Sequence, residues 1–291
     1  MSKKEKGNLG TAILKSLVTN PPKINDTTLF TNFIACVRKE SSEARVSGRL
    51  GQLGNVFISS NNESNIKAVQ DSNTIILATD PQDVEKILTN PAFRDAIADK
   101  LVISVAAGWT QKRLEETLYG TATPQAHIVR VLPNIAALVS QSLTAIETPP
   151  DAPLPSSTAA ITDAIFNRIG RTVYISPTQM ETITAVGGST PAFFAIIVDA
   201  MIDAAVAVGL PRDLAQTAVY QAMRGTAGML QGGVHPGLLK DQGTSPEGCT
   251  MGGVMVLEEA GVRGHVGRAL REAVTVARLM GRVEHVNDTR Q

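Results

Sequence analysis

Five short, almost continuously apolar runs constrain the fold of the first half of this chain more than any other feature. They lie at residues 33–37, 55–58, 74–78, 101–105 and 127–131. Such runs are typical of strands that are buried on both faces. Helix-like stretches such as residues 82–88 and 110–118 separate them, and this alternation indicates a parallel sheet covered by helices on both sides. The first half is therefore predicted to be an α/β domain.

The second half of the chain changes to helices. A Pro-rich break at residues 148–155 is followed by a helix at 157–169 and a short strand at 172–175. Further helices are expected at residues 191–208, 212–230, 251–259 and 264–280. We predict one domain over residues 1–178 and an all-helical domain over residues 179–291. A single continuous α/β domain is the alternative, which the lack of strands after residue 175 disfavours.

Composition and charge exclude several function classes. The chain has 27 Lys+Arg, 27 Asp+Glu, a pI near 6.9 and only 4% aromatic residues. A neutral chain has no general attraction to nucleic acid or anionic membranes, and few aromatic residues are present to stack on bases. The four histidines lack the spacing of metal ligands, so no metal is expected. Cys36 and Cys249 are expected to be reduced thiols of a cytoplasmic protein.

A membrane span is not expected either. The most apolar stretch, residues 191–208, contains Asp199 and Asp203, which share one helix face because they are four residues apart. Carboxylates at these positions favour a helix that is buried in, or at an interface of, a water-soluble protein. No apolar signal-peptide run follows the charged N-terminus, and the cytoplasm is the expected location.

A glycine-containing turn, Gly7-Asn8-Leu9-Gly10, precedes the first expected helix, residues 11–18. Glycines at a helix start let backbone N–H groups approach a phosphate, as in dinucleotide-binding folds. The full GxGxxG fingerprint follows a strand, whereas Met1–Lys6 is short and rich in lysine, with Glu5 in the place of the first glycine. A helix start with two permissive glycines is the alternative interpretation.

Arg38 directly follows the first apolar run. At this strand end, dinucleotide-binding folds place an acidic residue on the ribose of NAD or a basic residue on the 2′-phosphate of NADP. Arg38 therefore suggests NADPH. The alternative is a solvated pair with Lys39, to which the nearby Glu40 lends support.

A third motif, residues 240–250, leads into the helix expected at 251–259. Gly, Ser and Thr residues with free backbone N–H groups at a helix start form an anion site suited to a carboxylate. The alternative is ordinary helix capping, with Thr250 as the cap and Lys240 and Asp241 as an exposed ion pair.

Several motifs together resemble the pyrroline-5-carboxylate reductase family. Residues 183–193, ITAVGGSTPAF, are similar to the family's VTALSGSGPAY, and residues 235–242, HPGLLKDQ, to its HPxxLKDQ. Ser245–Thr250 resembles SPGGTT. Shorter matches are GLPR at residues 209–212, LEEAGVR at 257–263, AAG at 106–108 and RVLPN at 130–134. The resemblance spans roughly residues 7–280, which makes chance similarity implausible.

The resemblance implies an α/β N-terminal Rossmann-like domain and an all-α C-terminal dimerisation domain. It implies a homodimer, in many members a ring of dimers, that reduces the cyclic imine 1-pyrroline-5-carboxylate to L-proline with NADPH, or alternatively NADH. The substrate carboxylate would bind the backbone of the Ser245–Thr250 turn, and the Thr250 hydroxyl would bond the imine nitrogen. The expected substrate residues are Ser245, Glu247, Gly248, Cys249 and Thr250. The expected cofactor residues are Gly7, Asn8, Leu9, Gly10, Arg38, Ala78, Asp80, Pro81, Ala106, Ala107, Gly108 and Asn134.

Departures from the family pattern qualify these expectations. Asp80 stands where the family has a lysine, Glu247 and Thr190 where it has glycines, and Ala136 where it has a proline. The changes motivate two alternatives. One is reduction of the six-membered 1-piperideine carboxylate to pipecolate. The other is a catalytically weak paralogue that retains only the dimer module.

The first strand of the Rossmann-like domain is missing from this pattern. A Rossmann sheet places that strand centrally, directly before the glycine turn, and Met1–Lys6 is unsuited to a buried strand. We therefore expect its neighbours to have unpaired backbone groups and this chain to bind either cofactor poorly. Either the true product begins upstream, or the cofactor site has been lost. The intact helix after Gly7 favours the first explanation.

Overall fold

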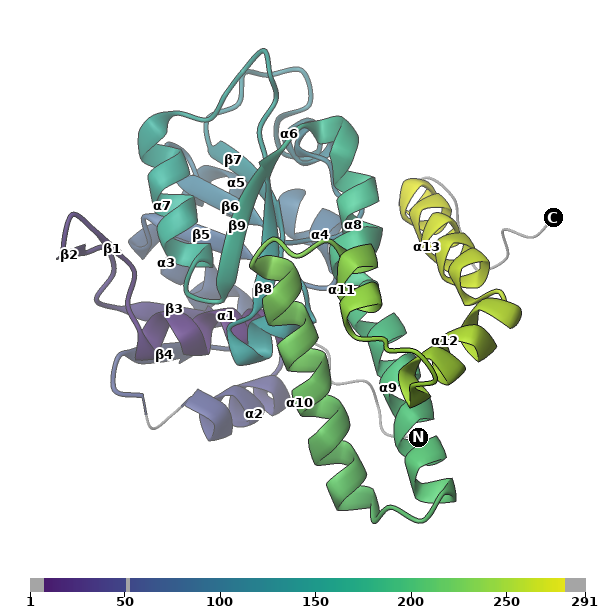
Figure 1. Ribbon diagram of the computed structural model, residues 1–291. Coiled ribbons are helices and arrows are strands. Elements are labelled where there is room, and N and C mark those ends of the chain that lie inside the picture. The colour runs from purple at the N-terminus through teal and green to yellow at the C-terminus, as the bar shows by residue number, and fades with distance from the viewer. Residues whose placement is uncertain (1–7, 51–52, 281–291) are drawn as a thin grey trace. The chain divides into compact units, whose positions relative to one another are not determined.

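The computed structural model describes residues 8–50 and 53–280 (Figure 1). Its contacts divide the chain into two compact units, Met1–Gly188 with Val276–Gln291, and Ser189–Thr275. Helix α8 (Met180–Gly188) contacts strand β8 (Ser142–Glu147) of the first unit. The contacts divide the chain after Gly188, ten residues beyond the boundary expected from the sequence. The boundary after residue 178 therefore stays a prediction.

A five-stranded sheet forms the centre of the first unit, in the order β5-β6-β7-β8-β9. Besides β8, its strands are β5 (Thr74–Leu77), β6 (Leu101–Ser104), β7 (His127–Leu132) and β9 (Gly170–Ile175). Strands β5, β6 and β7 are parallel, as predicted. The expectation of an all-parallel sheet is wrong at β8, which runs antiparallel to β7 and pairs in parallel with β9. No apolar run marks β8 in the sequence.

Strands β3 (Phe33–Cys36) and β4 (Val56–Ser59) form a separate parallel pair (Figure 1). Within the described part of the chain, β3 pairs only with β4, and β5 pairs only with β6. All four residues of β6 are buried, whereas Ile34 of β3 and Ile76 of β5 are only half-buried. The segment expected to lack a central strand, residues 1–6, lies outside the described residues. Among residues 8–50 and 53–280, β3 and β5 each have a single partner strand, and the expectation of unpaired neighbours stays a prediction.

Alternating residues of β6 supply the two cores of the first unit. Ile103 packs with Ile13 of α1 (Asn8–Thr19) and Phe166 of α7 (Ser156–Phe166) on one side. Val102 packs with residues of the opposite helices on the other side. Those helices are α3 (Asn62–Asp71), α4 (Pro81–Leu88), α5 (Pro91–Ala96) and α6 (Gln111–Tyr119). Two separate cores show that helices cover both faces, as the apolar runs predict.

Shorter elements complete this unit. They are β1 (Lys23–Ile24), β2 (Thr27–Thr28), α2 (Glu40–Leu50), the 3-10 turn η1 (Ile135–Val139) and the 3-10 turn η2 (Pro177–Gln179). Strands β1 and β2 form an antiparallel hairpin. Neither the hairpin nor α2 was predicted from the sequence.

The second unit is helical, as predicted. Its helices are α9 (Thr190–Ala207), α10 (Arg212–Gln231), α11 (Pro236–Gln242), α12 (Cys249–Glu259) and most of α13 (Val262–Leu279). An ion pair of 2.7 Å between Arg212 and Asp203 joins α10 to α9. Large apolar side chains are exposed on these helices, including Ile196 at 70% and Val256 at 63%.

One helical stretch of the described chain, Pro177–Ala207, is long and apolar enough to cross a membrane by length and composition. Its most apolar 18-residue window has a mean hydropathy of 1.7, and 6% of that window is buried. Asp199 and Asp203 lie within it, and its exposed side chains require a cover of some kind. The expectation that no membrane is involved stays a prediction.

Candidate active site

Three loops lie along one edge of the five-stranded sheet, because each follows a parallel strand. Leu77, Ser104 and Arg130 stand in register on β5, β6 and β7, so the chain leaves all three strands at the same edge. The indole Nε1 of Trp109 donates a 2.9 Å hydrogen bond to the carbonyl oxygen of Pro81. This bond holds the loop after β6 against the start of α4. Ligands of open α/β sheets bind at this carboxyl edge.

Six of the predicted cofactor residues meet there. Ala78, Asp80 and Pro81 follow β5, and Ala106, Ala107 and Gly108 follow β6. Gly108 has a φ of 77°, a left-handed conformation that glycine adopts without steric cost. Their assignment to a cofactor stays a prediction.

The start of α1 lies against the end of β5. A Cβ atom added to Gly10 would stand 3.1 Å from the Cβ of Ala78, so glycine permits this close approach. Leu9 is half-buried and packs on the core beside Ala78. Gly7 lies outside the described residues, and the Asn8 backbone begins the helix. A helix N-terminus at a carboxyl strand edge presents N–H groups and a positive dipole end, which suits a phosphate.

Asp80 is the N-cap of α4. Its side chain accepts a 3.2 Å hydrogen bond from the backbone N–H of Gln82, and Pro81 takes the first helical position. Capping explains locally why an aspartate is stable at a position where the related family has lysine. It also places a carboxylate at the edge where a nucleotide's phosphates are expected.

Arg38 forms an ion pair with Asp83. The guanidinium Nη1 lies 2.6 Å from the Asp83 Oδ1, and the two side chains are 62% and 38% exposed. Asp83 belongs to the first turn of α4, so the pair joins the chain after β3 to the helix after β5. The sequence assigned Arg38 to a 2′-phosphate, with a solvated surface pair as the alternative, and missed Asp83 because a contact across 45 residues leaves no local signal.

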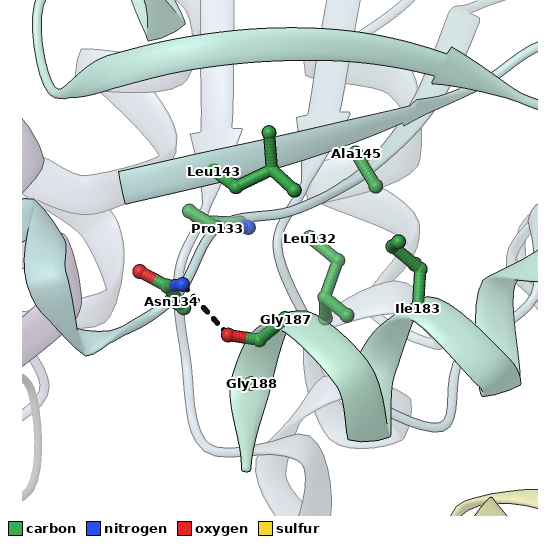
Figure 2. A pocket seen from close by; sticks show the side chains of 8 residues that line it. All are labelled: Leu132, Pro133, Asn134, Leu143, Ala145, Ile183, Gly187 and Gly188. Atoms are coloured by element: carbon green, nitrogen blue, oxygen red, sulfur yellow. Dashed lines mark hydrogen bonds between the residues drawn. The ribbon is translucent and has the colours of Figure 1, made fainter. Parts of the chain in front are cut away.

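Asn134 hydrogen-bonds through its backbone N–H and through both ends of its side-chain amide, and Figure 2 shows the bond to Gly187. Its backbone N–H donates to the Ser142 hydroxyl at 2.9 Å, and its Oδ1 accepts from the N–H of Ala136 at 3.1 Å, which caps η1. Its Nδ2 donates to the carbonyl oxygen of Gly187 at 2.7 Å. Asn134 thus ties the loop after β7 to the end of α8. Its expected part in shaping a nicotinamide pocket stays a prediction.

A small apolar cavity adjoins Asn134 (Figure 2). Its lining comes from the ends of β7 and β8 and from α8: Leu132, Pro133, Asn134, Leu143, Ala145, Ile183, Gly187 and Gly188. The Asn134–Gly187 hydrogen bond runs along one side of this cavity. The lining is mostly aliphatic, which suits packing better than recognition of a charged group.

A buried ion pair lies within the sheet. Arg130 of β7 and Glu147 of β8 are 4% and 3% exposed, and the Arg130 Nη1 lies 2.9 Å from the Glu147 Oε2. Burial raises the pKa of Glu147, while Arg130 opposes this rise and Glu181 adds to it. Glu147 was missed from the sequence because β8 itself was not recognised.

The predicted substrate residues lie together in the second unit. The N–H of Gly248 donates to the carbonyl of Ser245 at 3.0 Å, closing a tight turn with Pro246 and Glu247 at its centre. Glu247 has a φ of 60°, a left-handed conformation that is costly for a residue with a Cβ. A Cβ on Gly248 would stand 2.6 Å from the Ser245 hydroxyl oxygen, so only glycine fits there.

The turn leads directly into α12. Gly248 is its N-cap, and Cys249 and Thr250 are its first two residues. The capping alternative for Thr250 is therefore wrong, because Thr250 lies inside the helix. The exposed ion pair of Lys240 and Asp241 is present, at 2.6 Å. The first amides of a helix lack intrahelical partners, so the turn leaves backbone N–H groups for an anion.

No cluster of three or more His, Cys, Asp or Glu side chains that could hold a metal occurs among residues 8–50 and 53–280. The groups at the sheet edge instead fit a nucleotide. Gly10 lets the start of α1 pack closely against Ala78 at this edge, where the first N–H groups of a helix suit a phosphate, and a guanidinium such as that of Arg38 suits a further one. The carboxylates of Asp80 and Asp83 oppose that charge.

Two family models match the chain. The model described as pyrroline-5-carboxylate reductase dimerisation matches residues 177–280. The model described as NADP oxidoreductase coenzyme F420-dependent matches residues 6–108.

Individual relatives match over nearly the whole length. A pyrroline-5-carboxylate reductase of Lophium arboricola is 39% identical over 303 residues, covering 98% of this chain and 94% of the relative. A structure of a pyrroline-5-carboxylate reductase from Coxiella burnetii is 25% identical, with a TM-score of 0.77 and coverage of 95% and 96%. A Plasmodium falciparum pyrroline carboxylate reductase with NADP bound is 25% identical, with a TM-score of 0.71 and coverage of 86% and 98%.

Proposed function

Because the chain belongs to the pyrroline-5-carboxylate reductase family, we propose that it reduces the cyclic imine 1-pyrroline-5-carboxylate to L-proline. The observation that carries the proposal is the turn at Ser245–Gly248, which opens the amides of α12 toward an anion, with the Thr250 hydroxyl one residue beyond the start of the helix. A five-membered imino acid offers a carboxylate and a ring nitrogen a short distance apart. The names of the relatives favour this ring over the six-membered alternative.

Each part of the site has a separate task. The bound nicotinamide supplies hydride to the electrophilic imine carbon. The residues after β5 and β6, together with the start of α1, hold the nucleotide. The backbone of the Ser245–Thr250 turn binds the substrate carboxylate. The Thr250 hydroxyl would bond the ring nitrogen and orient the ring, and the nitrogen would take up a proton from water, through Thr250 or directly, as hydride adds to the carbon. Apart from this proton, the protein contributes mainly by positioning.

NADPH is the proposed hydride donor. A guanidinium binds a phosphate with paired hydrogen bonds, and Arg38 is the basic side chain at the strand end where a 2′-phosphate would lie. The neighbour with NADP bound supports this preference. Arg38→Ala is expected to weaken NADPH binding and to leave NADH nearly unchanged. Equal losses for both cofactors would assign Arg38 a structural role.

The protein is proposed to act as an obligate homodimer, which in turn could build a ring. The exposed apolar side chains of α9 and α12, such as Ile196 at 70% and Val256 at 63%, need a cover that a unit of few helices does not supply. A second copy provides it, and the matched dimerisation model supports that choice. Light scattering that shows a stable monomer at low micromolar concentration would contradict the proposal. The cytoplasm remains the proposed location.

The enzymatic proposal is tested by following NADPH oxidation with both imine rings. The protein is expected to consume NADPH with the five-membered imine and to form L-proline. Faster turnover of the six-membered imine would favour the pipecolate alternative. No turnover of either ring by a folded dimer would favour the weak paralogue.

A further inference from the structure

The Arg38–Asp83 ion pair stands at the place where the proposed cofactor would present its 2′-phosphate. Arg38 lies just after β3, and Asp83 lies in the first turn of α4. Their 2.6 Å contact uses one of the two terminal amino groups of the guanidinium. A phosphate that arrives here meets a cation that already has an anionic partner.

The local charges make this competition unfavourable for NADPH. Asp80 caps α4 and Asp83 lies in its first turn, so two carboxylates stand at the start of the helix whose Asp83 contacts Arg38. A phosphate monoester carries close to two negative charges at neutral pH, whereas the 2′-hydroxyl of NADH carries none. A carboxylate in contact with Arg38 therefore repels NADPH and leaves NADH nearly unaffected.

A role in stability alone does not account well for this pair. The side chains are 62% and 38% exposed, and exposed ion pairs contribute little to folding. The contact is nonetheless short and joins two segments 45 residues apart. The Arg38–Asp83 contact should have its largest effect on the affinity of a ligand that must bind the same guanidinium.

We propose that Asp83 is a specificity-determining residue, an internal anion that competes with the 2′-phosphate of NADPH for Arg38. Asp83 thereby lowers the affinity for NADPH but not that for NADH, so the ratio of the two affinities becomes smaller. This inference rests on the proposed cofactor site but not on the identity of the imine. Asp83 touches Arg38 rather than the reacting atoms, so it acts on cofactor choice and not on hydride transfer.

Calorimetric titration of the purified protein with NADPH, NADH and 2′,5′-ADP tests the proposal. Asp83→Asn keeps the size of the side chain and removes its charge. At a separation of about 6 Å in a water-like dielectric, losing one charge near a phosphate should tighten NADPH and 2′,5′-ADP about fivefold to tenfold. NADH affinity should stay the same. High salt should shrink the gain, because exposed charges are screened.

Two control variants distinguish an effect of the Arg38–Asp83 contact from a general effect of negative charge on α4. Glu85→Gln removes an equal charge from the same helix, two residues further on and thus away from the face of Asp83; it should leave the NADPH to NADH ratio unchanged. In an Arg38→Ala background only the direct repulsion between Asp83 and the phosphate remains, so Asp83→Asn should gain less NADPH affinity there than with Arg38 present, and equal gains in both backgrounds would leave no competition for the guanidinium.

Several results would overturn the proposal. Weaker NADPH binding in Asp83→Asn would mean that Asp83 orients Arg38 for the phosphate. Equal gains for both cofactors, an equal gain in Glu85→Gln, or no binding of 2′,5′-ADP by either protein would each remove the proposed competition. Binding that behaves as expected in a protein without imine turnover would uphold this inference and refute the proposed reaction instead.

Discussion

The side-chain amide of Asn134 donates a 2.7 Å hydrogen bond to the carbonyl of Gly187, the penultimate residue of α8. Asn134 follows β7 at the ligand-binding edge of the sheet, and Gly187 directly precedes the helical unit. One side chain thus fixes the end of α8 to the sheet that carries the proposed cofactor site. Asn134 is a positioning residue in this account.

Asn134→Asp tests that link. Aspartate keeps the oxygen that caps η1 but loses the N–H donor, so the Gly187 carbonyl faces a carboxylate. The free energy of unfolding is expected to fall by about 1–3 kcal/mol, measured by urea denaturation. Asn61→Asp is the matched control, because Asn61 caps α3 with its oxygen. Equal stability of Asn134→Asp and the parent would show that the hydrogen bond to Gly187 is not structurally important.

Thr250→Val should lower kcat and kcat/KM together while leaving stability unchanged. The hydroxyl is assigned to the imine nitrogen, where its bond matters most as hydride arrives. Since Gly248 caps α12, no cap is lost. Thr250→Ser should recover much of the rate, and Thr217→Val on α10 serves as the control for replacing a helical threonine. Unchanged kcat in Thr250→Val would remove Thr250 from the mechanism.

The buried ion pair gives a prediction for stability. Glu147→Leu leaves the Arg130 charge buried without its partner, which should cost about 3–5 kcal/mol. The double variant Arg130→Met with Glu147→Leu replaces both charges by apolar groups and should recover most of that loss. Denaturant unfolding of the three variants measures both effects. A double variant no more stable than Glu147→Leu would indicate that the pair has a packing role that apolar residues do not fill.

The same pair predicts a pH dependence. Burial raises the folded-state pKa of Glu147, so the folded protein holds this proton more tightly than the unfolded chain does. Its contribution to stability is fully present below the unfolded carboxyl pKa of about 4.3. It is lost as the pH rises through the raised folded value. The double variant Arg130→Met with Glu147→Leu should lack this pH-dependent change in the free energy of unfolding. If the change persists in the double variant, other titratable groups cause it.

Glu247 tests the substrate turn. Its φ of 60° should make Glu247→Gly more stable than Glu247→Ala by about 1 kcal/mol, since both remove the charge and only glycine relieves the backbone. Urea unfolding compares the two. Equal stabilities would mean that the turn tolerates a side chain at this position without strain.

Within the described part of the chain, β3 pairs only with β4 and β5 only with β6, which leads to a prediction about pairing. Replacing residues 2–6 by an apolar strand sequence that ends in glycine should let a strand pair with both edges. Hydrogen exchange of Ile34 and Ile76 should slow, and NADPH should bind more tightly. A replacement of the same length that carries a proline in the middle is the control, because proline lacks a backbone donor. Unchanged exchange at both residues would contradict a strand site between the edges.

Much of this architecture could be predicted because it is encoded locally. The apolar runs of β3 to β7 and the helical periods of α9, α10, α12 and α13 depend on neighbouring residues alone, whereas the short helix α11 was not predicted. Strand β8 was missed because a strand paired antiparallel after a short turn needs no continuous apolar run. The partners of Arg38 and Arg130 could not be found, since Asp83 and Glu147 come close only after the sheet forms.

Some features of the candidate site could likewise be predicted from the sequence, and others could not. Thr250, Arg38 and the loops after β5 and β6 follow from motifs and from the rule that ligands bind at carboxyl strand edges. The capping of α4 by Asp80 and the contacts of Asn134 depend on helix ends and on a distant carbonyl. They become visible only in three dimensions.

Direct transfer of hydrogen from cofactor to product tests the central claim most directly. The protein is incubated with 1-pyrroline-5-carboxylate and NADPH that carries deuterium on the reactive face of the nicotinamide, and the product is examined by mass spectrometry. The account predicts L-proline with one deuterium on the carbon that was doubly bonded to nitrogen, with little formed by Thr250→Val. Absence of labelled proline from a folded, dimeric protein at saturating cofactor would contradict it.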